Sequence, residues 1–138
     1  MHRLVLEWTA QGGVSALRID HPDGLADPLD YFRRLQEAVF LARCRRIDGG
    51  ADDDWAAAEP LLREMFAARI EADPHGPLRR ACSIVVEKIL SRNENLPDDW
   101  PVDGTVGYGF LNALNGLFVD PAGQSSIESG YLEFTGDA

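Results

Sequence analysis

Residues 3–20, RLVLEWTAQGGVSALRID, decide the fold that the sequence predicts. Residues 3–9 alternate between apolar and polar side chains, a pattern that is typical of a half-buried strand. Residues 14–20 continue in a similar way, and residues 11–13 between them include two glycines that accept positive φ. Two strands joined by such a loop pair as an antiparallel hairpin, so the sequence predicts a hairpin at the N-terminus.

Two long helices are predicted after the hairpin. Asp27 is the expected N-cap of the first, Pro28 takes its first helical position, and the helix runs to about Ile47. The second begins near the acidic residues 52–54, where carboxylates favour a helix start. Pro60 lies inside this second stretch and predicts a kink or a new start, because proline removes a backbone hydrogen bond.

The remaining segments are shorter and more mixed in pattern. A third helix is expected from Pro77 to about Ile89, although the β-branched run at residues 84–86 is also compatible with a strand. Residues 93–106 are expected to form a long loop, and its glycine run at residues 104–109 to be a flexible turn.

The end of the chain completes the predicted fold. A short helix is expected from Tyr108 to Phe118, followed by a strand from Ile127 to Phe134. A lone hairpin is marginally stable, so this strand is expected to join it. The predicted class is therefore α+β: one domain over residues 1–138, with a small antiparallel sheet packed against three to four helices.

The charge of the chain is concentrated near its C-terminus. The net charge is −10, and residues 93–138 hold eight acidic residues and no Lys or Arg. An acidic surface repels phosphates, so nucleic acid is not an expected partner, whereas a basic protein is. A homodimer remains open. No apolar run approaches the length of a membrane span, and Glu7 comes too early for a signal peptide, so a cytoplasmic bacterial protein is expected.

No motif in the sequence names a reaction. The three histidines are isolated, and the spacing of a metal site is absent, so neither a metal nor a cofactor is predicted. Cys44 stands among arginines that would activate an exposed thiol, but a buried structural role is the favoured interpretation. Paired carboxylates of the glycosidase kind cannot be chosen from 23 acidic residues by sequence alone. No catalytic residue is therefore assigned.

The favoured candidate surface is a protein-binding one in the acidic third of the chain. Its residues are Asp98, Asp99, Trp100, Asp103 and Tyr108. Tryptophan and tyrosine provide large rigid contact areas with a polar group, which suits protein recognition. The alternative for Trp100 is that it folds back and holds the long loop against the core.

Three functions are compatible with these observations. The favoured one is an acidic protein-binding module rather than an enzyme, for example a toxin-neutralising immunity protein or a regulatory adaptor. The first alternative is a small enzyme or ligand-binding domain whose site is assembled by the fold, with a cavity lined by Trp8, Tyr108 and Phe110. The second is a structural subunit of a phage or secretion assembly.

Overall fold

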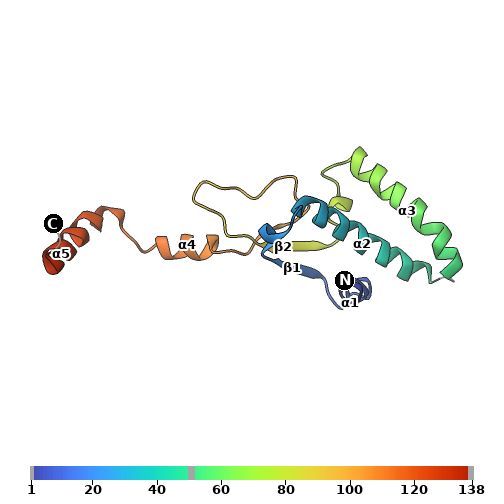
Figure 1. Cartoon of the computed structure of the whole chain (residues 1–138), viewed down its shortest axis with the longest axis horizontal. Coiled ribbons are helices and arrows are strands. Elements are labelled where there is room, and N and C mark those ends of the chain that lie inside the picture. The colour runs from blue at the N-terminus through green and yellow to red at the C-terminus, as the bar shows by residue number, and fades with distance from the viewer. Residues whose placement is uncertain (1, 50–51, 137–138) are drawn as a thin grey trace. The chain divides into compact units, whose positions relative to one another are not determined.

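The computed structural model describes residues 2–49 and 52–136, which fall into two compact units. The first unit spans Met1–Gly107 and the second Tyr108–Ala138. Figure 1 shows the strands and the two long helices in the first unit, and two shorter helices in the second. The single domain expected over residues 1–138 stays a prediction.

The first unit alternates helices with short strands along the chain. Its elements are α1 (Arg3–Ala10), β1 (Ala16–Asp20), the 3-10 turn η1 (Pro22–Gly24), α2 (Pro28–Asp48), α3 (Asp52–Ala72), the 3-10 turn η2 (Pro77–Arg80), β2 (Ser83–Glu87) and β3 (Gly104–Thr105).

All three strands run parallel, in the order β1-β2-β3. The register between β1 and β2 runs from Ala16 opposite Ser83 to Asp20 opposite Glu87. Parallel neighbours need a long crossover, and here α2 and α3 together provide it. The predicted antiparallel sheet is therefore wrong, and the described part of the chain is mostly helical.

The first predicted strand is helix α1. A short alternating run also fits a helix, because Val5, Leu6 and Thr9 then lie on one side. Thr9 is buried and its hydroxyl donates to the carbonyl oxygen of Val5 (2.8 Å), while Leu6 packs against the core. Leu4 and Trp8, which the strand was expected to bury, are 54% and 48% exposed.

The predicted third helix is a 3-10 turn followed by strand β2. Ile84 and Val86 are fully buried on one face of this strand. β-Branched side chains fit the pleated surface of a sheet better than a helix, and a buried parallel strand reads as a nearly continuous apolar run. The arginines at positions 79 and 80, which favoured a helix, form η2 instead.

The glycine run expected to be a flexible turn contains strand β3 and its ordered end. The backbone N–H of Lys88 donates to the Thr105 hydroxyl (3.1 Å), and that hydroxyl lies 2.7 Å from the Lys88 carbonyl oxygen. A Cβ at Gly107 would lie 2.7 Å from the same carbonyl, so a glycine is needed for this close approach. The run therefore holds the backbone that follows β2.

The helix signals around α2 are confirmed. The Asp27 carboxylate accepts the N–H of Asp30 (2.9 Å), and Pro28 begins the helix. Gly49 ends it with a φ of 59°, a left-handed conformation that favours glycine. α3 continues through Pro60 as one helix, so no new start occurs there.

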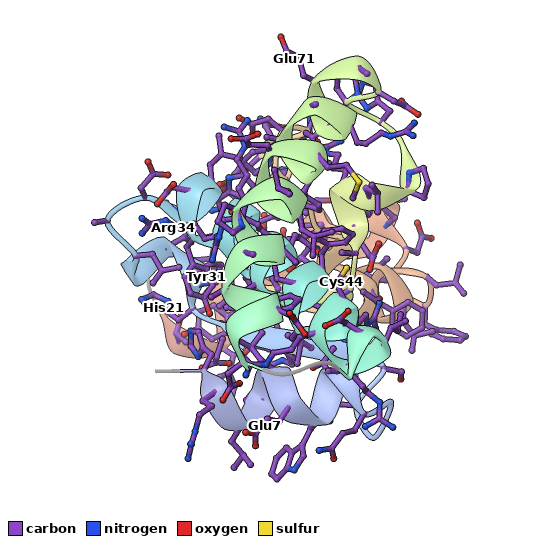
Figure 2. All side chains as sticks on the ribbon, turned by 90° about the vertical axis from the view of Figure 1, so that its right-hand side faces the viewer. Glu7, His21, Tyr31, Arg34, Cys44 and Glu71 are labelled. Atoms are coloured by element: carbon purple, nitrogen blue, oxygen red, sulfur yellow. The ribbon has the colours of Figure 1, made fainter. Side chains whose placement is uncertain are left out.

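The core lies between α2 and one face of the sheet. It contains Phe32, Leu35 and Val39 of α2, Cys82, Ile84 and Val86 around β2, and Trp100 and Val102 before β3. The rings of Phe32 and Trp100 lie 5.1 Å apart. α3 packs on α2 through Phe40 and Phe66, whose rings are 5.0 Å apart. Figure 2 shows Glu71 near the C-terminal end of α3, pointing away from the ribbon.

The buried polar side chain of Gln36 crosses this core. Its amide donates to the carbonyl oxygens of Cys82 (2.9 Å) and Pro101 (2.8 Å). Its carbonyl oxygen accepts the backbone N–H of Cys82 (2.7 Å). Gln36 is 1% exposed, so α2 is tied through these bonds to the segments that precede β2 and β3.

The second unit contains α4 (Gly109–Gly116), the 3-10 turn η3 (Pro121–Gly123) and α5 (Gln124–Thr135). A helix near residues 108–118 was expected, but the strand expected at residues 127–134 is part of α5. None of the described residues of α5 is buried, so its alternating apolar residues do not pack against a sheet. No helix among the described residues of the chain is long and apolar enough to cross a membrane.

Candidate active site

Two acidic residues end adjacent parallel strands at the carboxyl end of the sheet. Asp20 is the last residue of β1, Glu87 is the last residue of β2, and the two are register partners. Neighbouring strands lie about 4.8 Å apart, so the side chains of register partners start at that spacing. In α/β sheets, ligands bind outside the carboxyl ends of the strands. The position of this pair is therefore that of a functional site.

The pair faces away from the hydrophobic core. Leu17 and Ile19 pack against the core, and alternation along the strand places Arg18 and Asp20 on the opposite face. The Arg18 guanidinium lies 2.7 Å from the Asp20 carboxylate, with half of the arginine side chain exposed. A positive charge therefore accompanies Asp20 on the open face of the sheet.

The turn after β1 connects the two strand ends. The backbone N–H of His21 donates to Oε2 of Glu87 (3.3 Å). His21 has φ 45° and ψ 57°, and it is the one non-glycine residue with positive φ in the part of the chain that the structure describes. Pro22 is fully buried beneath the turn, and Gly24 closes it through an N–H bond to the carbonyl oxygen of His21 (3.1 Å).

Lys88, the residue after Glu87, makes a second connection. Its ammonium lies 3.0 and 3.1 Å from the two carboxylate oxygens of Asp23 in η1, and 2.7 Å from Glu94. Hydrogen bonds to Glu94 and then Asp23 raise the pKa of Lys88. The bond from Lys88, followed by the backbone N–H of Ser91, lowers the pKa of Glu94. The loops that follow β1 and β2 are thus joined by one cation.

Replacing Lys88 with Met should lower the melting temperature in a pH-dependent way. The lowered pKa of Glu94 means that its contribution is present above the unfolded carboxyl value of about 4.3 and is lost as the pH falls through the folded value. The raised pKa of Lys88 means that its contribution is present below about 10.4 and is lost as the pH rises through the folded value. The difference in melting temperature from the wild type should therefore be largest between about pH 6 and 9.

Thermal unfolding followed by circular dichroism from pH 3 to 10 checks this prediction. Arg92→Met is the matched control, because Arg92 is an exposed cation in the same loop. Its effect should be small at every pH. A Lys88→Met difference that stays constant down to pH 3 would show that the ion pairs do not stabilise the fold.

Two of the predicted protein-binding residues form internal contacts. Trp100 is 8% exposed and packs against Phe32, which is the alternative that the sequence left open for it. The Asp103 carboxylate accepts the Ser83 hydroxyl (2.6 Å) and the N–H of Ile84 (3.0 Å). The side chains of Trp100 and Asp103 thus make contacts inside the first unit.

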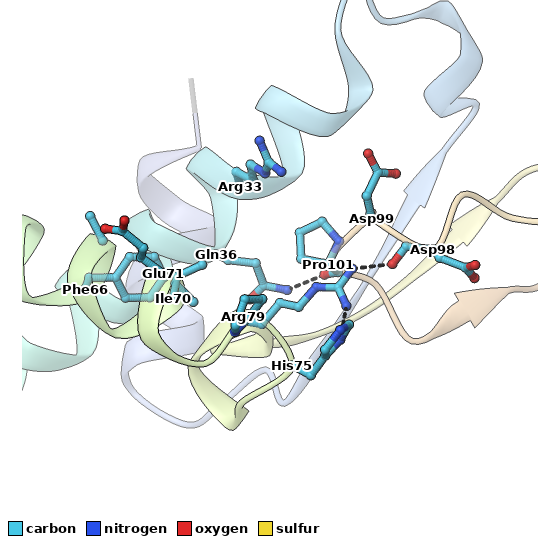
Figure 3. Close-up of a pocket in the computed structure, with 12 residues that line it drawn as sticks. Arg33, Gln36, Phe66, Ile70, Glu71, His75, Arg79, Asp98, Asp99 and Pro101 are labelled. Carbon is cyan, nitrogen blue, oxygen red and sulfur yellow. Dashed lines mark hydrogen bonds between the residues drawn. The ribbon is translucent and has the colours of Figure 1, made fainter.

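Asp98 and Asp99 line a pocket of about 640 Å³ together with residues of α2, α3 and η2. Figure 3 shows Arg79 between His75 and the backbone of Asp98. The Arg79 guanidinium donates a hydrogen bond to the Asp98 carbonyl oxygen. Gln36 also lines the pocket, and its polar groups are already hydrogen-bonded. The pocket lies where the chain enters β2 and β3, so it is at the opposite end of these strands from Asp20 and Glu87.

The three aromatic residues of the predicted cavity lie on the surface. Tyr108 and Phe110 of the second unit are 56% and 80% exposed, and Trp8 belongs to the first unit. Burial raises the pKa of the Cys44 thiol, which supports its structural interpretation. Among the described residues, no three His, Cys, Asp or Glu side chains are grouped closely enough to hold a metal ion. The basic protein partner and the homodimer stay predictions.

Known proteins resemble this chain over nearly its whole length. No family model matches. A protein of Mycobacterium tuberculosis named as a maltooligosyl trehalose synthase is 31% identical over 126 residues, which are 91% of this chain and 11% of that protein. The maltooligosyltrehalose synthase of Arthrobacter ramosus has a TM-score of 0.62 at 31% identity, covering 98% of this chain and 13% of that one. A variant of the same enzyme has a TM-score of 0.61.

These relatives correct the predicted function. They are named as enzymes, so the protein-binding module, the immunity protein and the expectation of a non-enzyme are wrong. The alternative of an enzyme whose site is assembled by the fold agrees better with them. The chain spans about a tenth of the length of the curated relatives that it matches.

Sequence reasoning missed Asp20, His21 and Glu87. The signal that was available is their position: Asp20 follows an apolar strand and precedes a Pro-Asp-Gly turn, and Glu87 follows a β-branched run. Two such strands, if paired in parallel, place their last residues at one edge. The third helix expected over Glu87 concealed this arrangement.

Proposed function

We propose that this chain supplies the two carboxylates of a glycosyl-transfer site that acts on malto-oligosaccharides. The observation that carries the proposal is the register of the sheet, which sets Asp20 and Glu87 opposite each other at the carboxyl ends of adjacent parallel strands. The similarity to maltooligosyltrehalose synthases supports the choice of substrate.

The spacing of the strands suits a retaining reaction. Retaining enzymes hold their two carboxyl groups about 5–5.5 Å apart, whereas inverting enzymes need about 6.5–9.5 Å to admit a water molecule. Neighbouring strands about 4.8 Å apart favour the shorter separation. Malto-oligosaccharides are α-linked, and trehalose joins two α-anomeric carbons, so transfer between these linkages also retains configuration.

The surroundings of each carboxylate suggest its role. Asp20 is exposed and lies beside the Arg18 guanidinium, so it is the nucleophile that attacks the anomeric carbon. Glu87 is half-buried, and it is the acid that gives its proton to the departing glycosidic oxygen. The glycosyl group is then bonded to Asp20, and the released sugar carries the proton.

The second half of the reaction returns both carboxylates to their first state. Glu87, now ionised, takes the proton of an acceptor hydroxyl, whose oxygen attacks the anomeric carbon and displaces Asp20. If the acceptor is the anomeric hydroxyl of the released sugar, the product ends in a trehalose unit and has no reducing end. If the acceptor is water, the reaction is hydrolysis and a reducing end is gained.

Incubating the purified protein with maltopentaose and counting reducing ends tests the proposal. Transfer to an anomeric hydroxyl should lower the number of reducing ends while total glucose and chain length stay constant. A rise in reducing ends would identify hydrolysis instead of transfer, and a constant number with unchanged sugar would contradict the proposed function.

A further inference from the structure

We infer that His21 and Lys88 are positioning residues, which fix the separation of Asp20 and Glu87 by tying the end of β1 to the end of β2. His21 acts through its left-handed backbone and Lys88 through its ammonium group. This inference rests on the proposed function of the two carboxylates.

The backbone of His21 determines where its N–H points. The φ angle of His21 sets the orientation of the peptide plane that contains this N–H relative to the turn at residues 22–24. The buried side chain of Pro22 holds that turn in place. A change to negative φ would rotate the N–H away from Glu87 or move the turn. The conformation of His21 is unusual for two reasons: non-glycine residues rarely adopt positive φ, and residues before proline favour extended backbone.

The imidazole of His21 has a smaller part in this arrangement. Among the described residues it makes no hydrogen bond, whereas the backbone N–H of the same residue reaches Glu87. The ring lies over Gly24, where a Cβ would come within 3.0 Å of Cδ2. Residues that accept positive φ should therefore replace His21 without loss of the connection.

Lys88 makes the connection reciprocal. His21 follows Asp20 and bonds to Glu87, while Lys88 follows Glu87 and bonds to Asp23 in the turn after Asp20. The Lys88 side chain is only 11% exposed, and its second partner Glu94 holds it from the loop after β2. The residue after each carboxylate thus binds the strand end that carries the other.

A substitution series at His21 separates the backbone from the imidazole. His21→Gly and His21→Asn should keep kcat within about threefold of the wild type, because both residues accept positive φ. His21→Val should lower kcat about 10- to 100-fold with little change in KM, because small displacements of a reacting group cost that much. A Val variant equal to the wild type, or a Gly variant as impaired as Val, would overturn the role of the backbone.

A parallel series tests Lys88. Lys88→Met should lower kcat about tenfold at similar KM. Lys88→Arg should retain most of it, because Arg keeps a positive charge that can bond to the carboxylates of Asp23 and Glu94. Arg92→Met is the matched control in the same loop and should leave both constants unchanged. Equal kcat in the Met variant and the wild type would remove Lys88 from the inference.

Nuclear magnetic resonance tests the His21 connection without reference to activity. The amide proton of residue 21 should move upfield in Glu87→Ala, because this substitution removes the oxygen that accepts its hydrogen bond. The control Glu64→Ala removes an exposed carboxylate on α3 and should leave this signal in place. An unmoved signal in Glu87→Ala would overturn the inference even where His21→Val does not fold.

The two proposals can fail separately. Full turnover in Asp20→Asn would reject the proposed function, whereas a shifted amide signal of residue 21 in Glu87→Ala would still support the connection between His21 and Glu87. Loss of turnover in Asp20→Asn together with full kcat in both His21→Val and Lys88→Met would keep the function and reject the positioning residues.

Discussion

The Asp20→Asn variant is expected to convert malto-oligosaccharides at least about 1,000-fold more slowly than the wild type, because an amide cannot form the covalent glycosyl intermediate. Glu87→Gln should lose a comparable amount, since a positioned acid–base group contributes about 10²–10⁴-fold. The rate of loss of reducing ends with maltopentaose measures both effects.

An activated donor distinguishes the two roles. Maltosyl fluoride has a leaving group that needs little help from an acid, so Glu87→Gln should still release fluoride and accumulate the glycosyl-enzyme on Asp20. Asp20→Asn should release none above background. Mass spectrometry of the intact protein detects the added maltosyl group.

The exposed carboxylate of Glu64 on α3 provides the control, and Glu64→Gln should keep the wild-type rate. Circular dichroism of all three variants shows whether each is folded. Wild-type turnover in a folded Asp20→Asn protein would remove this residue from the chemistry, and the reverse pattern with maltosyl fluoride would exchange the two roles.

The second large effect is expected on stability, at Gln36. Gln36→Leu leaves the N–H and carbonyl of Cys82 and the carbonyl of Pro101 buried without a partner. Three such groups at about 1–3 kcal/mol each cost about 3–9 kcal/mol, so the free energy of unfolding should fall by at least about 3 kcal/mol. Folded proteins have a total free energy of unfolding of about 5–15 kcal/mol, so this loss is a large share of the stability.

Urea unfolding followed by tryptophan fluorescence measures this loss. All three tryptophans, Trp8, Trp55 and Trp100, lie in the first unit, so the signal reports the part of the chain that contains Gln36. Arg34→Leu places the same side chain at an exposed position of α2 and should change stability by less than about 0.5 kcal/mol. Equal losses in both variants would mean that the buried hydrogen bonds are not the cause.

The parts of the fold that local signals determine were predictable from the sequence. α2 has its start in Asp27 and Pro28 and its end in Gly49, and all three act within one turn of the helix. Such signals do not depend on any distant segment. The prediction of this helix was therefore confirmed close to its true ends.

The sheet was not predictable in the same way, because its pairing is non-local. Leu17 meets Ile84 only after two helices have intervened, and no residue near either strand indicates that partner. The alternation at residues 3–9 and 127–134 predicts strands, but runs this short also fit helices. Without a strand at residues 83–87, a parallel sheet could not be inferred.

The candidate site depended on the same missing information. Asp20 and Glu87 are two of 23 acidic residues, and only the register of the sheet distinguishes them from the rest. His21 gave no sign in the sequence of its positive φ. The clustering of acidic residues near the C-terminus favours Asp98, Asp99 and Asp103 instead. These three residues precede β3, at the other end of the strands from Asp20 and Glu87.

The crossover between β1 and β2 also sets the order in which the site is assembled. β1 leaves the ribosome before α2 and α3 are made, so its partner strand does not yet exist. Helices form within microseconds from local contacts, whereas pairing of distant parallel strands is slow because a long loop must close first. A newly made chain therefore has its helices before its two carboxylates meet.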